Sequence, residues 1–144
     1  MRVVFTKSLD LPSKANLWDC SKAKTLVIYD SSTANEKFLA RIPKCVEVEK
    51  VSSDNPELIS KLLAERGCNK VLWECGPKLA TQAVKSGCIN EIISFIAPKI
   101  LGGYMSMNPF GDFEFREMQE IIKLSESQLR LIGDDICLKS IFKN

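Results

Sequence analysis

The fold of this chain is decided by residues 71–80, which read Val71-Leu72-Trp73-Glu74-Cys75-Gly76-Pro77-Lys78-Leu79-Ala80. An apolar run ends on an acid, turns at Cys75-Gly76 and starts a helix at Pro77. Proline suits the first helical position because its missing N–H group would be unpaired there anyway. The free N–H groups of such a turn and the helix dipole favour a phosphate group. The stretch therefore predicts a buried strand that delivers an acid and an anion-binding helix start to one edge.

Strands and helices alternate on both sides of this corner. Short apolar or alternating runs predict strands over 2–5, 24–29, 46–51, 69–74 and 91–97. A single helical turn is expected over 36–40, one helix from Asn55-Pro56 to a stop at Gly67, and another over 77–86 before Gly87. The strand–helix–strand order from 69 to 97 implies a parallel pair with a right-handed crossover.

The C-terminal part of the sequence lacks this alternation of strands and helices. Residues 120–124 and 136–142 read as strands without a helix between them, which suggests an antiparallel addition to the sheet edge. The predicted fold is therefore α/β, with a mixed, mostly parallel sheet flanked by helices and with antiparallel C-terminal strands. The apolar terminal hairpin also suits a homodimer formed by pairing or stacking of edge strands.

Composition restricts the class of protein. With 144 residues the chain is most simply one domain. Its net charge of +2, from 20 Lys+Arg and 18 Asp+Glu, is too small to indicate a nucleic-acid partner or an anionic membrane. The apolar stretches are too short to span a bilayer, and the one within 1–7 is too short for a signal peptide. We expect a soluble, cytoplasmic chain.

The cysteine and histidine content excludes several chemistries. Six cysteines stand at positions 20, 45, 68, 75, 88 and 137, without a CxxC spacing, and there is no histidine. No metal site is expected, because zinc needs clustered Cys and His ligands. Ser-His-Asp, Cys-His and zinc-deaminase catalysis are excluded for want of histidine. A secreted disulfide framework is not expected either, and most of the thiols are predicted to act as small apolar residues.

Three segments in order carry a resemblance to a known family: 71–79, then Gly87-Cys88-Ile89-Asn90-Glu91, then Ile96-Ala97-Pro98-Lys99-Ile100-Leu101-Gly102-Gly103. They resemble the reductase domain of the bifunctional riboflavin-biosynthesis deaminase–reductase. That family's pattern runs Val-Glu-Gly-Gly-Pro-x-Leu, a helix, Asp-Glu, a strand, and Ala-Pro-Lys before two hydrophobic residues and Gly-Gly. Looser similarity extends to 2–12 and to 132–138.

The resemblance implies a fold, an activity and a cofactor. The fold is that of dihydrofolate reductase, a mixed sheet with a reversed C-terminal strand. The activity is NADPH-dependent reduction of the phosphoribosylamino-pyrimidine 5-amino-6-(5-phosphoribosylamino)uracil to its ribitylamino form, with hydride supplied by the nicotinamide. The chain resembles the C-terminal two thirds of this reductase domain. We therefore expect 1–144 to be a single reductase domain, truncated at its N-terminus and without the zinc deaminase domain.

The resemblance also implies roles for site residues, each with a plain alternative. Glu74 would accept hydrogen bonds from the substrate, and otherwise it is a helix-cap or salt-bridge acid. The corner Cys75-Gly76-Pro77-Lys78-Leu79 would face the cofactor diphosphate, and otherwise it is an ordinary tight turn. Lys7 and Ser8 would hold the 2′-phosphate of NADPH, because a cation and a hydroxyl suit phosphate. Otherwise they are solvated surface.

Three departures from the family pattern leave a second function class open. Cys75 replaces the first glycine of the Gly-Gly pair, where a side chain crowds the approach of backbone to a diphosphate. Cys75 either carries a reactive thiol at a helix N-terminus or has replaced the glycine by drift. Thr6 replaces an expected Asp, and Asn90 replaces the Asp before Glu91, where a cap and a surface residue are expected. The alternative to a reductase is a non-catalytic α/β oligomerisation or interaction module that retains an unused cofactor corner.

Overall fold

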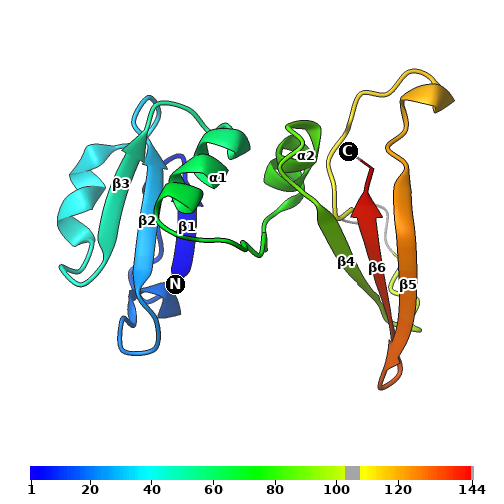
Figure 1. Ribbon diagram of the computed structural model, residues 1–144. Coiled ribbons are helices and arrows are strands. Elements are labelled where there is room, and N and C mark those ends of the chain that lie inside the picture. The colour runs from blue at the N-terminus through cyan, green and yellow to red at the C-terminus, as the bar shows by residue number, and fades with distance from the viewer. Residues whose placement is uncertain (103–107, 144) are drawn as a thin grey trace. The chain divides into compact units, whose positions relative to one another are not determined.

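The computed structural model describes residues 1–102 and 108–143, and the chain divides into two compact units, Met1–Asp54 and Asn55–Asn144 (Figure 1). The second unit is built around the predicted corner. Gly102, in the third segment of the resemblance, has a φ of 64°, whereas Gly103 lies outside the described residues. That the whole chain forms one reductase domain stays a prediction.

Unit 1 is a three-stranded parallel sheet in the order β1-β2-β3 (Figure 1). Its elements are β1 (Arg2–Thr6), η1 (Asn16–Trp18), β2 (Thr25–Asp30), η2 (Glu36–Arg41) and β3 (Glu47–Val51). Val27 pairs with Val4 on one side and with Val48 on the other. The three strands and the helical turn predicted for this part of the chain are confirmed within one or two residues.

The core of unit 1 lies on the central strand. Every residue of β2 is buried, as expected for the middle strand of a parallel sheet. On one face Val27 and Tyr29 pack with Leu9 and Val46. Half-buried apolar side chains from the loop after β1 and from η2 surround this cluster, among them Leu11, Trp18, Cys20, Phe38, Leu39 and Ile42.

Unit 2 contains two helices followed by an antiparallel sheet in the order β4-β6-β5 (Figure 1). Its elements are α1 (Pro56–Glu65), α2 (Pro77–Lys85), β4 (Glu91–Ile96), η3 (Met118–Glu120), β5 (Leu124–Ile132) and β6 (Asp135–Phe142). A two-residue loop, Gly133-Asp134, joins β5 to β6, with Gly133 at a φ of 62°. The antiparallel C-terminal strands predicted for the fold class are confirmed.

The helices of unit 2 begin and end where their local signals predicted. Asn55 Oδ1 accepts a hydrogen bond from the Glu57 N–H at 2.9 Å, and Pro56 occupies the first turn of α1. Ile59 and Leu63 form its buried face, each 2% exposed. Gly67 and Gly87 follow the two helices with positive φ angles of 85° and 71°, a conformation that glycine adopts without strain.

The strand predicted over 69–74 is wrong. Residues 69–74 form no strand, and within the described residues they have no ladder partner. Val71 and Leu72 are 38% and 76% exposed, so the apolar run is not the buried strand that was expected. The predicted parallel crossover from 69 to 97 fails with it, because β4 pairs with β6, antiparallel.

The strand predicted over 120–124 is also displaced. The segment before Leu124 contains the short helix η3, which a capping box between Glu117 and Glu120 stabilises. β5 starts only at Leu124 and runs nine residues, with an irregularity between Ser125 and Gln128. The described strands consequently form two three-stranded sheets, one parallel and one antiparallel.

Cysteine pairing departs in part from the sequence-based expectation. Cys20 and Cys45 form a disulfide in unit 1, whereas Cys68, Cys75, Cys88 and Cys137 are free thiols. Across 1–102 and 108–143, no group of His, Cys, Asp and Glu side chains is arranged to hold a metal ion. A search of the same residues for a helix of membrane-spanning length and apolarity finds none.

Candidate functional site

The predicted acid of the corner faces solvent. Glu74 lies in the irregular segment that leads into α2, and its side chain is exposed. The prediction that it ends a buried strand is therefore wrong. No described residue donates a hydrogen bond to its carboxylate or forms an ion pair with it. This carboxylate is thus available to a ligand, and the helix-cap and salt-bridge alternatives find no support among the described residues.

The start of α2 has backbone N–H groups that no described residue accepts. Gly76 is the N-cap, with φ −70° and ψ 168°, and no side chain caps the helix. The Ala80 N–H donates to the Gly76 carbonyl at 3.0 Å, whereas Pro77 has no N–H to donate. The N–H groups of Lys78 and Leu79 precede this bond, as is usual for the first turn of a helix. The corner therefore has the donor set that was predicted for an anion.

Steric access to this corner is open. Gly76 is exposed, and an added Cβ at this position would meet no heavy atom within 4 Å. Lys78, also exposed, adds a cation beside the N–H groups. Cys75 is half-buried, and burial raises the pKa of its thiol. The thiol is thus protonated at neutral pH and adds no negative charge, and its pKa moves opposite to that of a reactive helix-terminal thiol.

A contact that sequence analysis missed holds the first turn of α2. Thr81 Oγ1 donates to the Pro77 carbonyl at 2.8 Å and accepts from the Gly111 N–H, also at 2.8 Å. The Gly111 N–H lies 3.2 Å from the same Pro77 carbonyl. Thr81 is only 6% exposed. No local signal predicts this contact, because a threonine inside a helix pairs with a glycine 30 residues further along.

Lys7 and Ser8 lie in unit 1, in the loop after β1. Lys7 forms an ion pair with Asp54, although 59% of its side chain is exposed. The Ser8 Oγ accepts from the Asp10 N–H at 3.2 Å. The backbone of the loop is held by the Thr33 hydroxyl, which donates to the Lys7 carbonyl at 2.9 Å. The structure thus places the predicted site residues in two units: Lys7 and Ser8 in unit 1, and 74–79 in unit 2.

A pocket of about 370 Å³ lies in unit 1 beside this loop. Its lining comes from two segments, the loop after β1 and the end of η2. The Arg41 guanidinium lies 4.6 Å from the Phe38 ring centroid in a cation–π contact. The lining residues are Leu9, Asp10, Leu11, Pro12, Ser13, Trp18, Phe38, Arg41 and Ile42.

Asn90 and Glu91 have structural contacts. The Asn90 carbonyl accepts the Phe142 N–H at 3.0 Å, which extends the pairing of β4 with β6. The Glu91 carboxylate forms an ion pair with Lys139 at 2.6 Å. Both residues therefore fasten the start of β4 to its neighbour, in agreement with a structural role at the strand start.

Comparison with known protein families places almost the whole chain in one of them. The family model described as the RibD C-terminal domain matches residues 1–138. This chain belongs to the RibD C-terminal domain family. The resemblance read from the three ordered segments is thereby confirmed, and the match includes the corner at 74–79 and the loop at Lys7 and Ser8.

Two relatives of the RibD C-terminal domain family cover almost the whole chain. The riboflavin biosynthesis protein PYRR, chloroplastic, of Arabidopsis thaliana is 37% identical over 144 residues, 99% of this chain and 24% of that protein. The riboflavin biosynthesis protein RibD of Synechocystis sp. is 39% identical over 137 residues, 94% of this chain and 37% of that protein. The chain thus spans well under half the length of these relatives.

Solved structures confirm the fold class. A pyrimidine reductase-like protein from Corynebacterium diphtheriae has a TM-score of 0.78 at 22% identity, over 99% of this chain and 60% of that chain. A diaminohydroxyphosphoribosylaminopyrimidine deaminase/5-amino-6-(5-phosphoribosylamino)uracil reductase from Thermotoga maritima has a TM-score of 0.67 at 19% identity, over 99% of this chain and 37% of that chain. At these identities the likeness concerns the fold.

Proposed function

We propose that this chain is an NADPH-dependent reductase that converts 5-amino-6-(5-phosphoribosylamino)uracil to its ribitylamino form in riboflavin biosynthesis. The observation that carries the proposal is the family match over 1–138, which runs through an exposed acid followed by an open helix N-terminus. The same chemistry is named for the Thermotoga maritima protein of this fold. We treat the whole chain as a single reductase domain.

The residues of the corner fit a dinucleotide diphosphate. The N–H groups of Lys78 and Leu79 would donate to its oxygens, and the α2 dipole and the Lys78 cation would offset its charge. Pro77 fixes the backbone at the first helical position, and Gly76 leaves the approach open. The neutral thiol of Cys75 adds no repulsion. NADPH would supply the hydride, and these residues would bind and orient it.

Glu74 would bind the substrate. An exposed carboxylate without a partner among the described residues can accept hydrogen bonds from the hydroxyl groups of a ribosyl ring. Hydrogen bonds to a charged group contribute about 1.5–3 kcal/mol, so this contact would be strong enough to orient the sugar. Glu74 is therefore our candidate for the catalytic residue of the site, as a hydrogen-bond acceptor for the substrate.

Lys7 and Ser8 would bind the 2′-phosphate that distinguishes NADPH from NADH. The Lys7 ammonium group forms an ion pair with the Asp54 carboxylate, and a phosphate bound here would share or replace that partner. The neighbouring Ser8 hydroxyl can donate to a phosphate oxygen while its Oγ accepts from Asp10. Lys7→Gln would consequently raise KM for NADPH and leave KM for NADH unchanged.

The test is NADPH oxidation by the purified chain in the presence of the phosphoribosylamino-pyrimidine. We expect Glu74→Gln to fold normally and to lower kcat/KM about 10- to 100-fold, which is the loss of one charge-assisted hydrogen bond. Glu65→Gln, which changes another exposed acid of unit 2, is the matched control and should keep full activity. Wild-type kinetics in Glu74→Gln would remove this residue from the site.

A homodimer is the second part of the proposal. Several large apolar side chains of the antiparallel sheet are exposed, including Phe95 at 64%, Leu129 at 64% and Leu131 at 72%. Such surface favours association, either in a dimeric reductase or in the alternative non-catalytic oligomerisation module. Light scattering measures the dimer directly. Thermal stabilisation by micromolar NADPH separates the two functions, because a module with an unused corner gains none. A cytoplasmic location also remains a proposal.

A further inference from the structure

The disulfide of unit 1 links the two segments that continue from the walls of the 370 Å³ pocket. The first wall is the loop at 9–18, which ends two residues before Cys20. The second wall consists of Phe38, Arg41 and Ile42, and it ends three residues before Cys45. The Cα atoms of the two cysteines are 6.4 Å apart. The covalent bond therefore links the chain two residues after the first wall to the chain three residues after the second.

Among the described residues, hydrogen bonds join the segments that lead into the two walls, at the end away from the cysteines. There the Thr33 hydroxyl donates to the Lys7 carbonyl at 2.9 Å, and the Asn35 N–H donates to the Ser8 carbonyl at 3.3 Å. No hydrogen bond among the described residues joins 11–20 to 36–46. Near the cysteines the walls are connected by apolar packing and by the disulfide alone.

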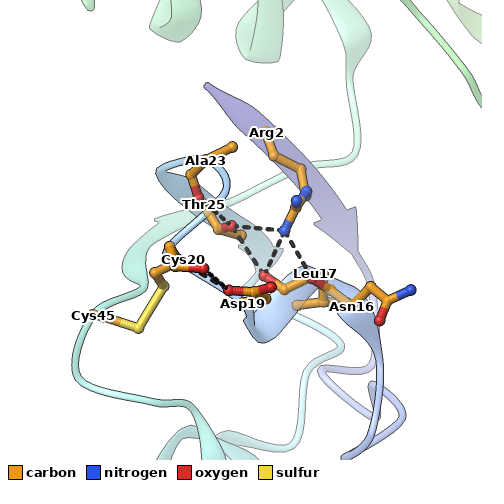
Figure 2. Close-up of a disulfide and its surroundings, with 9 residues drawn as sticks. Arg2, Asn16, Leu17, Asp19, Cys20, Ala23, Thr25 and Cys45 are labelled. Atoms are coloured by element: carbon orange, nitrogen blue, oxygen red, sulfur yellow. Dashed lines mark hydrogen bonds between the residues drawn. A yellow bond between two sulfur atoms is a disulfide. The ribbon is translucent and has the colours of Figure 1, made fainter.

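The first wall is anchored to the sheet independently of the disulfide. Figure 2 shows Arg2 directed at the backbone before Cys20, where its Nη1 donates to the Asn16 carbonyl at 2.9 Å and to the Leu17 carbonyl at 3.0 Å. The Thr25 hydroxyl donates to the same Leu17 carbonyl at 3.0 Å. The segment that carries the second wall is anchored, within the described residues, by the bond from the Tyr29 hydroxyl to Glu36 at 3.0 Å. Loss of the disulfide would therefore release the second wall.

We propose that the Cys20–Cys45 disulfide is a redox-controlled crosslink of this pocket, which a small or protein dithiol opens. Cys45 is exposed, so its sulfur is accessible to a thiolate, whereas Cys20 is half-buried against the core. Attack on the Cys45 sulfur forms a mixed disulfide and releases Cys20 as a thiolate, which takes up a proton. The second thiol of the reductant then releases Cys45. The chain gains two electrons and two protons, and the dithiol becomes a disulfide.

Reduction would act on the proposed cofactor loop, a consequence that rests on the proposed function. The first wall continues directly from Lys7 and Ser8, and Leu9 is both a pocket residue and part of the core cluster. When the second wall is released, Leu9 loses packing against it, and the loop that would hold the 2′-phosphate becomes more mobile. The reduced chain would therefore bind NADPH more weakly than the oxidised chain.

The experiment compares amide hydrogen exchange of the oxidised chain, the chain reduced with dithiothreitol, and the reduced chain reoxidised. We expect reduction to accelerate exchange at 36–46 at least tenfold. Exchange at 2–6 and in the β5–β6 hairpin should be unchanged, and reoxidation should restore the original protection. Thiol counting should show two new thiols. Equal exchange at 36–46 in both states, or a disulfide that resists the dithiol in the native chain, would overturn the proposal.

Variants separate the crosslink from general effects of thiols. The double variant Cys20→Ser/Cys45→Ser should exchange like the reduced chain with or without dithiothreitol. Cys68→Ser, at a free cysteine of unit 2, is the control and should keep the full redox response. If the double variant does not fold, the reversible reduction of the wild-type chain decides alone.

NADPH affinity is measured in the same samples. Weaker binding after reduction supports the link to the cofactor loop, whereas equal binding in both states refutes that link. No binding in either state contradicts the proposed function, while a change in exchange at 36–46 would still establish the crosslink.

Discussion

Thr81 provides a sharp test of how the first turn of α2 is held. Its hydroxyl joins the first turn of α2 to the segment at Gly111 through two hydrogen bonds of 2.8 Å. Thr81→Val removes both bonds and preserves the shape of the side chain. Thr81→Ser, the matched control, keeps the hydroxyl and removes the methyl group.

The expected loss in stability is modest for both variants. Two neutral hydrogen bonds contribute about 2 kcal/mol, and the extra methyl of valine returns up to about 0.8 kcal/mol. The net cost of Thr81→Val is thus about 1 kcal/mol, because the Gly111 N–H still has the Pro77 carbonyl at 3.2 Å. Thr81→Ser loses about 0.8 kcal/mol for the buried methyl group. Global unfolding therefore cannot distinguish the two, and a local measurement is needed.

The local measurement is hydrogen exchange at the Gly111 amide. Thr81→Val should accelerate it roughly fivefold relative to wild type, which corresponds to about 1 kcal/mol. Thr81→Ser should leave it near the wild-type rate. Equal protection of Gly111 in the wild-type and valine proteins, or equal loss in both variants, would refute the reasoning. Urea unfolding followed by the fluorescence of the two tryptophans, Trp18 and Trp73, supplies the global reference.

Two further predictions concern the stability of unit 2. Leu63→Ala, at a site 2% exposed, should reduce the free energy of unfolding by about 2–5 kcal/mol in urea titrations, whereas Leu58→Ala, 44% exposed on the same helix, should cost much less. The backbone N–H groups of Arg116 and Glu117 hold the pKa of the Glu120 carboxyl below its usual 4.5. Because this pKa is lowered by folding, its stabilising effect is present above pH 4.5 and disappears as the pH falls through the folded-state pKa. Glu120→Gln should therefore flatten the loss of stability below pH 4.5 in acid titrations, and an unchanged slope would contradict this assignment.

Local chemistry made parts of the fold predictable. Asn55 with Pro56 begins α1, and Pro77 begins α2, because these residues favour their positions whatever surrounds them. Gly67 and Gly87 follow the helices for the same kind of reason, since each adopts a positive φ. The donor set of the anion corner depends on these local preferences and was predicted on that basis.

Features that depend on distant partners were not predictable from single segments. An apolar run such as 69–74 can form a strand, but whether it does depends on an available ladder partner. The Cys20–Cys45 pair is separated by 25 residues, and only the folding of unit 1 brings its sulfurs together. The bond from Gly111 to Thr81 depends on a similar long-range approach.

Local preferences and long-range contacts also differ between the two parts of the proposed chemistry, diphosphate binding and the role of Glu74. Diphosphate binding needs the backbone of a helix start, which Gly76 and Pro77 specify locally. It therefore does not require the preceding residues, 69–74, to form a strand. The role of Glu74 needs a carboxylate at a defined place beside the substrate, and that place depends on the segment that carries it. Since this segment is not part of either sheet, we expect the proposed cofactor binding to be separable from the proposed turnover. NADPH affinity should consequently survive Glu74→Gln, whereas the rate of hydride transfer should not.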